Sequence, residues 1–224
     1  HLLEPAWWSV VALGVCAAAG FSETRRFLRD QATLRPLREA ASAGVWWVVL
    51  AGIPMAALLI GACFPPSALW RSELRGFDVM EYHLEIPREY AAANSTAPLA
   101  HNVYSLFPAN VEMLYLLETQ FARTTTGSDS YLAGIFPAQF LHALLMLLTA
   151  AALALAPVRV IRGAAARCAA GVLFLAIPWT LVTGSLAYNE GGMMLAGTLA
   201  LLLALTLAPG LAAPRDRVGR RQTL

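Results

Sequence analysis

Five apolar runs alternate with polar segments along this chain of 224 residues. A helix that crosses a bilayer needs about 20 predominantly apolar residues, within a range of about 17–25. The middle three runs have that length, the first is slightly short, and the last is long enough if Asn189 and Glu190 lie at its mouth. No period of two, typical of barrel strands, is seen. We therefore predict an all-α, polytopic transmembrane helix bundle of about five spans: 6–21, 44–64, 131–156, 169–186 and 191–208.

Basic residues predict how these spans are oriented, because cytoplasmic loops are enriched in Arg and Lys. All sixteen basic residues are Arg, and twelve of them lie in three segments that alternate correctly between the spans. We expect these segments on the cytoplasmic side of a membrane. The predicted parts are two N-terminal spans with an Arg-rich link (1–64), an outer loop (65–130), three further spans (131–210) and a cytoplasmic tail (211–224).

The composition agrees with a chain embedded in lipid. Hydrophobic residues make up 58% of the sequence and charged residues only 13%, whereas a soluble domain has about 25% charged residues. The abundance of Arg and Ala favours a bacterial source, so we expect the bacterial inner membrane, with the outer loop facing the periplasm. The chain begins with His1 rather than Met, and we expect it to be a fragment of a longer protein.

The outer loop holds eight of the fourteen acidic residues, against four Arg. Loops longer than about 12–15 residues are usually functional or disordered, and the aromatic and aliphatic residues of this one favour a folded segment. Pro87 and Pro108 suit the first turn of a helix. We expect short amphipathic helices at 78–86, 87–93 and 108–121, the last of them on the membrane surface. A polar hinge is expected to follow at 124–130.

Asp78 opens the most informative of these segments. On a helix, Asp78, Tyr82, Glu85 and Glu89 would share one face. A carboxylate near a surface of low dielectric constant becomes more basic, which suits a general base that takes a proton from a hydroxyl. The alternative is that these acids form an ordinary solvated face, with Arg88 nearby.

The order of residues here resembles a known family. Residues 77–90 read F-D-x-x-x-Y-H-L-x-x-P-R-x-Y, and residues 102–115 read N-x-Y-S-x-x-P-x-x-x-E-x-L-Y. Both are similar to the first outer loop of bacterial GT-C glycosyltransferases, which include protein O-mannosyltransferases and lipid A aminoarabinose transferases. The resemblance implies many transmembrane helices and transfer of a sugar from a polyprenyl-phosphate carrier to an acceptor on the outer side. It also implies that Asp78 is the base, or that it positions the acceptor or a metal.

The same resemblance marks a second acid and a set of binding residues. Glu190 follows Tyr188 and Asn189 in a short outward turn, where relatives place an acid; the alternative is that it only ends a helix. Arg88, with a histidine, would neutralise the leaving phosphate, although a loop histidine is often merely solvated. His142, inside the third span, is expected to bond to other helices. The predicted substrate-binding residues are Tyr82, His83, Arg88, His101, Asn102, Tyr104 and Glu112.

The sequence has no Walker A, G-x-G-x-x-G, G-x-S-x-G or H-E-x-x-H motif. It requires no cofactor, although its carboxylates would suit a hard cation such as Mg²⁺ or Mn²⁺. The expected partners are the lipid bilayer, a polyprenyl-phosphate-linked sugar donor and an unknown acceptor, but no nucleic acid. Two alternatives stay open: a transporter or flippase for a lipid-linked sugar, and a non-catalytic, truncated membrane scaffold.

Overall fold

The structure, a computed structural model, is built from helices alone in the residues that it describes, which are 18, 21, 25, 31–42, 44–69, 76–126, 131–156 and 160–208. This confirms the predicted all-α class for that part of the chain. The elements are α2 (Gln31–Ser42), α3 (Val45–Ala62), α4 (Pro66–Leu69), the π-helix η1 (Val79–His83), α5 (Glu85–Ala93), the 3₁₀-helix η2 (Val103–Leu106), α6 (Asn110–Thr126), α7 (Tyr131–Ala154), α8 (Ala164–Ala176), α9 (Pro178–Gly184) and α10 (Glu190–Leu207).

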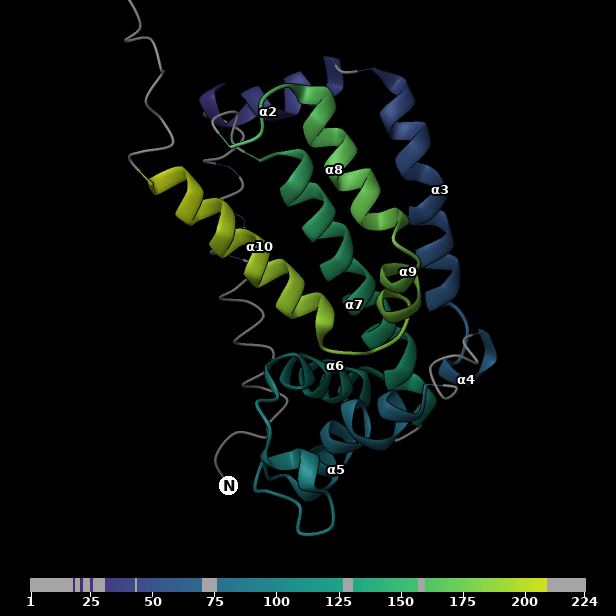
Figure 1. Ribbon diagram of the computed structural model, residues 1–224. Coiled ribbons are helices and arrows are strands. Elements are labelled where there is room, and N and C mark those ends of the chain that lie inside the picture. The colour runs from purple at the N-terminus through teal and green to yellow at the C-terminus, as the bar shows by residue number, and fades with distance from the viewer. Residues whose placement is uncertain are drawn as a thin grey trace, which may run out of the picture.

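The long apolar helices form a bundle around α7. Helix α7 packs against α8 on one side and α10 on another, and α3 packs against α7, α8 and α9 (Figure 1). Small residues allow the closest of these contacts. A Cβ atom added to Gly171 of α8 would lie 2.7 Å from the carbonyl oxygen of Ala150 in α7, so the two helix backbones almost touch there. Small residues at such crossings are typical of membrane bundles.

Among the described residues, two helices are long and apolar enough to cross a membrane, Gly134–Ala154 and Glu190–Leu207. The number is three if the bent pair α8–α9 counts as one span. Helix α3 is apolar but shorter, with its apolar part at Trp46–Ala62. The first predicted span, 6–21, lies outside the described residues except for positions 18 and 21. The prediction of about five spans is therefore confirmed only as far as an apolar bundle with two or three candidate spans.

The predicted span 169–186 is wrong in its bounds, because the chain forms two helices there. Helix α8 begins at Ala164, and the chain bends by 63° between α8 and α9. Pro178 causes the break: it lacks a backbone N–H and forces the preceding residue out of the helical region. Ile177 accordingly has extended backbone angles (φ −62°, ψ 121°), and Pro178 begins α9.

The short helices of the segment 65–130 gather at one end of the bundle. Figure 1 shows α4, α5 and α6 at this end and α2 at the other, beside the start of α8. Arg-bearing α2 and the acidic segment therefore lie at opposite ends, as the alternation of charge predicts. The side of the membrane that each end faces stays a prediction, and so do the domain bounds. The predicted tail, 211–224, lies outside the described residues.

The short helices differ from their predicted bounds by a few residues. Helix α5 begins at Glu85 and not at Pro87, so Pro87 is its third residue. Asn94 ends α5 as expected, with a left-handed φ of 47°, a conformation that Asn tolerates better than most residues. Helix α6 continues through Thr126, so the predicted hinge starts later than 124, and residues 127–130 lie outside the described part.

An ion pair holds α2 against α8 at the Arg-bearing end. The fully buried guanidinium of Arg167 donates to the Glu39 carboxylate, with the two atoms 2.7 Å apart. Arg35 donates to the same carboxylate over 2.8 Å. Hydrogen bonds from Arg35 and Arg167 lower the pKa of Glu39 below its ordinary value of 4.5. Arg167, predicted to be a cytoplasmic link residue, is therefore part of the helix packing.

One buried core ties the acidic segment to the bundle. It combines residues of η1, α6, α7 and the turn that precedes α10, so the short helices are anchored on the ends of the long ones. Burying such side chains stabilises a fold by about 25 cal/mol per Å² of apolar surface. The core residues are Val79, Leu84, Val111, Tyr115, Ile135, Ala138, Leu186, Ala187 and Tyr188.

Candidate functional site

Asp78 stands at the start of η1, next to Gly76. Gly76 has a φ of 70°, and a Cβ atom there would lie 2.8 Å from the Cβ of Pro66, so only glycine lets the chain turn this closely past α4. Asp78 is half-buried and makes no capping bond with its side chain within the described residues. The π-helix that follows has the wider bonding pattern often found at functional sites, with the Leu84 N–H donating to the Val79 carbonyl over 3.0 Å.

A buried histidine–carboxylate pair joins η1 to α6. The Nδ1 atom of His83 is 2.6 Å from Oε1 of Glu112 on α6, and the two side chains are only 3% and 5% exposed. The His83 ring lies between Tyr82, at 4.1 Å between ring centroids, and Tyr188, at 5.3 Å. Such a pair fixes the ring in one orientation. His83 is thus a buried residue and not one on an open loop surface.

Three carboxylates from separate elements act on Tyr82. Burial raises the pKa of Tyr82 to about 12, and the negative charges of Asp78, Glu190 and Glu112 add to this effect, as does Tyr104. Tyr104 of η2 stacks on the Tyr82 ring, with centroids 4.2 Å apart. The two predicted catalytic acids, Asp78 and Glu190, therefore both contribute to the raised pKa of one phenol.

The turn that carries Glu190 is anchored from two sides. The Tyr115 hydroxyl of α6 donates to the carbonyl of Tyr188, and the N–H of Gly191 donates to Nε2 of His142 over 2.7 Å. A Cβ atom on Gly192 would lie 2.5 Å from Cγ2 of Val111 in α6, so this end of α10 sits tightly on α6. Burial raises the pKa of Tyr115 well above its ordinary value, and Glu112, Glu118 and Glu190 add to the rise.

Glu112 and Glu190 each have one carboxylate oxygen, Oε2, that is buried and lacks a hydrogen-bond partner among the described residues. A buried acceptor without a donor costs about 1–3 kcal/mol, or more when it is charged. Proteins rarely keep such atoms unless a ligand, water or ion satisfies them. We call Asp78, Tyr82, His83, Glu112 and Glu190 the acid cluster; its two unpartnered carboxylate oxygens are hydrogen-bond acceptors.

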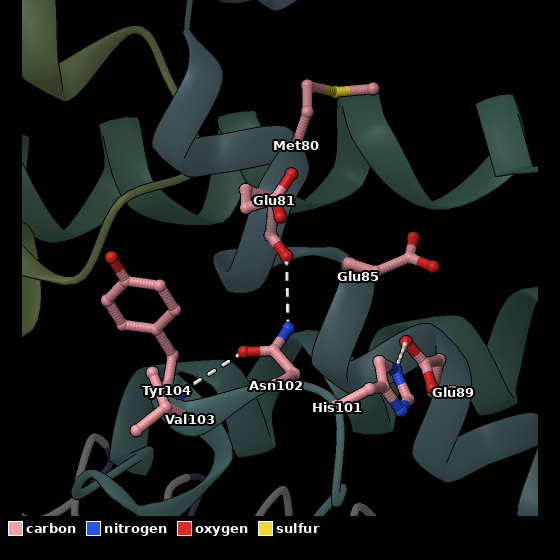
Figure 2. Close-up of a pocket in the computed structure, with 8 residues that line it drawn as sticks. All are labelled: Met80, Glu81, Glu85, Glu89, His101, Asn102, Val103 and Tyr104. Carbon is pink, nitrogen blue, oxygen red and sulfur yellow. Dashed lines mark hydrogen bonds and ion pairs between the residues drawn. The ribbon is translucent and has the colours of Figure 1, made fainter.

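A groove of about 420 Å³ opens between η1, α5 and η2. Figure 2 shows Asn102 between its walls, with its amide donating to the carbonyl of Glu81 over 3.2 Å and its oxygen accepting from the N–H of Tyr104 over 3.1 Å. His101 lies 3.0 Å from the Glu89 carboxylate. The lining residues are Met80, Glu81, Glu85, Glu89, His101, Asn102, Val103 and Tyr104.

The predicted single face of Asp78, Tyr82, Glu85 and Glu89 assumes an unbroken α-helix, whereas the structure has a π-helix followed by an α-helix here. Glu85 and Glu89 line the groove, whereas Tyr82 contacts His83 and stacks on Tyr104. The five-residue bonding step of η1 and the new start of α5 at Glu85 shift the register. Acids on the groove side are therefore spaced as Glu81, Glu85 and Glu89.

Each predicted phosphate-binding cation has a carboxylate partner. Arg88, half-exposed on α5, forms two hydrogen bonds with Glu85. His101 pairs with Glu89, and His83 with Glu112. A phosphate would have to compete with these carboxylates for its donors. The residues brought together best by the fold are the acids and the aromatic rings.

Glu118 was not among the predicted site residues, although it follows Glu112 and Tyr115 at intervals of three along α6, which is the signal that marks it. Burial raises its pKa from 4.5 to about 7, and its Oε2 atom has no hydrogen-bond partner in the described part of the chain. The protein thus carries an acid that is only partly ionised at neutral pH, beside Tyr115.

The raised pKa of Glu118 predicts a stability that depends on pH. Between pH 4.5 and 7 the folded protein keeps a proton that the unfolded chain has lost, so stability falls as the pH rises through this window. We expect a loss of about 1–2 kcal/mol after allowance for solvent screening. Thermal unfolding in detergent across this range should show it, and Glu118→Gln should remove that share of the slope. An unchanged slope in the variant would contradict the assignment.

No group of three His, Cys, Asp or Glu side chains is arranged to hold a metal ion within the described ranges 31–42, 44–69, 76–126, 131–156 and 160–208. The Mg²⁺ or Mn²⁺ suggested by the carboxylates stays a prediction.

Comparison with known proteins adds no relative: no family model, no curated protein and no solved structure matches this chain. The likeness to GT-C glycosyltransferases therefore rests on the order of residues in 77–90 and 102–115.

Proposed function

We propose that this chain belongs to a membrane glycosyltransferase that moves a sugar from a polyprenyl-phosphate carrier to an acceptor on the outer face of the membrane. The proposal rests on three carboxylates, Asp78, Glu112 and Glu190: the last two each have a buried oxygen without a partner among the described residues, and the charges of all three raise the pKa of Tyr82. They come from η1, α6 and α10, so folding alone assembles them. The apolar helical bundle next to these carboxylates supports the proposal that the sugar donor is linked to a lipid.

In the proposed reaction, the half-buried carboxylate of Asp78 takes the proton of an acceptor hydroxyl. The acceptor oxygen attacks the anomeric carbon, and the bond from that carbon to the phosphate oxygen breaks. The electron pair of that bond leaves on the polyprenyl phosphate. Glu190, with its unpartnered Oε2, would accept a hydrogen bond from the acceptor or sugar and so orient it. General-base catalysis of this kind contributes about 10²- to 10⁴-fold.

The leaving phosphate needs positive charge or hydrogen-bond donors. Arg88 and His101 are the proposed donors, because both are exposed near the groove, whereas His83 is buried. Each would have to exchange its carboxylate partner for the phosphate. Tyr104 and Asn102, which line the groove, would contact the sugar. Tyr82 and the His83–Glu112 pair would form the rear wall that keeps Asp78 partly out of water.

A transporter of a lipid-linked sugar is the second candidate, and one observation favours it. The break between α8 and α9 gives a discontinuous apolar helix, and such helices often surround substrate sites in transporters. Helix α7, which packs against both α8 and α9, has buried polar side chains, including Gln139 and His142. A transporter would move an intact donor, whereas a transferase would break the bond to phosphate.

Reconstitution of the full-length protein in liposomes distinguishes the two candidates. A radiolabelled polyprenyl-phosphate sugar would be supplied together with extracts that contain acceptors, and free polyprenyl phosphate and labelled acceptor would be measured. We expect release of polyprenyl phosphate in step with labelling, and about tenfold less of both in Glu190→Gln, equivalent to about 1.4 kcal/mol. Movement of uncleaved donor across the bilayer, without release, would support the transporter instead.

A further inference from the structure

The first turn of α10 has a hydrogen-bond acceptor supplied by another helix. The first N–H groups of any α-helix have no partner within it and need one from elsewhere. Here the N–H groups of Gly192 and Met193 reach the carbonyl of Asn189, at 3.1 Å and 3.3 Å. Asn189, the residue before the helix, makes no side-chain capping bond within the described residues. The N–H of Gly191 donates instead to Nε2 of His142 on α7, over 2.7 Å.

This contact defines the state of the His142 ring. An imidazole nitrogen that accepts a hydrogen bond carries no proton, so His142 is neutral with its proton on Nδ1. The side chain is fully buried. Backbone carbonyls of Thr183, Gly184 and Leu186 lie around the ring, although Nδ1 has no partner in hydrogen-bond geometry within the described part of the chain. His142 thus lies between the end of α9 and the start of α10.

Steric fit makes the contact specific. A Cβ atom on residue 191 would lie 2.8 Å from Nε2 and 2.9 Å from Cδ2 of His142, so only glycine allows the backbone to come this close. The Gly191 N–H belongs to the peptide bond that directly follows Glu190. On the other side of Glu190, the carbonyl of Tyr188 is held by the Tyr115 hydroxyl. Two anchors therefore bracket Glu190, a member of the acid cluster.

We infer that His142 is a positioning residue, which directs the carboxylate of Glu190 toward the other members of the acid cluster by accepting the Gly191 N–H. This inference rests on the proposed function of Glu190, but the contact itself can be tested without any activity. His142 lies within the candidate span Gly134–Ala154, and an uncharged histidine buried there is consistent with a role as a neutral acceptor. The role is that of a cap from a neighbouring helix, with a catalytic residue at the capped end.

A matched pair of variants tests the contact. In His142→Gln the side-chain oxygen reaches the place of Nε2, whereas in His142→Asn it reaches only the place of Nδ1. Amide hydrogen exchange of Gly191, in the full-length protein in detergent, is expected to be slow in the native protein and in His142→Gln. It is expected to be at least about tenfold faster in His142→Asn, as for the loss of one buried hydrogen bond. Equal protection in both variants would overturn the inference.

Sugar transfer by the same variants tests the role in function. We expect His142→Asn to lose about tenfold in rate, His142→Gln to recover most of that loss, and His142→Asn to have no further effect when Glu190 is already Gln. Additive losses would mean that His142 acts on something other than Glu190. If exchange changes as expected but Glu190→Gln transfers sugar normally, the contact is real and the proposed function of Glu190 is wrong.

Failure of the variants to fold would not leave the contact untested. The amide of Gly191 belongs to the first turn of α10, so its protection in the native protein requires an acceptor outside that helix. Exchange at the rate of an unstructured peptide in the native protein would overturn the inference directly. Protection at Gly191 that matches the interior of α10 would support it.

Discussion

Replacing Asp78 by asparagine is expected to lower the rate of sugar transfer by about 10²- to 10⁴-fold, the usual contribution of a general base. Asparagine has nearly the same shape, so the half-buried site at the start of η1 should stay folded. It has neither the negative charge nor the basicity of the carboxylate. The measurement is transfer of radiolabelled sugar by the full-length protein in liposomes, at equal protein and with the same elution from a sizing column.

The same substitution has a second readout that needs no substrate. Asp78 is the carboxylate with the largest charge effect on Tyr82, whose pKa burial and that charge raise to about 12. Ultraviolet titration of Asp78→Asn should therefore show one phenol that ionises at lower pH than in the native protein. Asp78→Glu, which keeps the charge, is the matched control and should keep most of that rise. Undiminished transfer in Asp78→Asn, with the phenol shifted as expected, would refute the catalytic role and leave the geometry standing.

Gly171→Ala is expected to destabilise the bundle by about 1–3 kcal/mol, the usual cost of inserting a methyl group into a packed interior. The added Cβ would lie 2.7 Å from the Ala150 carbonyl oxygen and 3.3 Å from the Cβ of Ala154. The first of these contacts is to backbone, which cannot rotate away as a side chain could. Helices α7 and α8 would have to separate, and α3, which packs on both, would lose contact.

Gly197→Ala on α10 is the matched control, because no described atom lies within 4 Å of its added Cβ. Alanine is also the better helix former by about 1 kcal/mol in water. Thermal unfolding in detergent, followed by circular dichroism, should show a lower midpoint for Gly171→Ala, by about 2–4 °C per kcal/mol. The midpoint of Gly197→Ala should not be lowered. Equal midpoints would mean that α7 and α8 do not approach as closely as described.

Local elements of the acidic segment were predictable because their signals are local. Asn94 ends a helix where a left-handed residue is needed, and Pro108 precedes the start of α6. The errors also have local causes. Helical periodicity assumes a regular α-helix, so it could not predict the π-helix of Val79–His83. That π-helix changes the register between Tyr82 and Glu85, which the periodicity had placed on one α-helical face. The bend before Pro178 divides a run whose hydropathy alone indicates one span.

The candidate site was predictable only in part. The motif order marked Asp78 and Glu190, but no pattern along the chain tells how far apart they lie. The buried pair of His83 and Glu112 depends on the contact between η1 and α6. The contact of His142 with Gly191 depends on the crossing of α7 and α10. Such long-range contacts are decided by how helices pack, which a periodic pattern does not encode.

By itself, the sequence determined that the described part is a bundle of apolar helices, with basic and acidic residues in different connecting segments. The reason is that the length and periodicity of apolar runs depend directly on the solvent that each helix face meets. It also determined which side chains could serve as acids and donors. Only the tertiary structure decided that Asp78, Glu112 and Glu190 act on one phenol, and that Arg88 and His101 are already paired. The physical reason is that charge effects and buried hydrogen bonds depend on distances between helices, whereas helix formation depends mainly on neighbours along the chain.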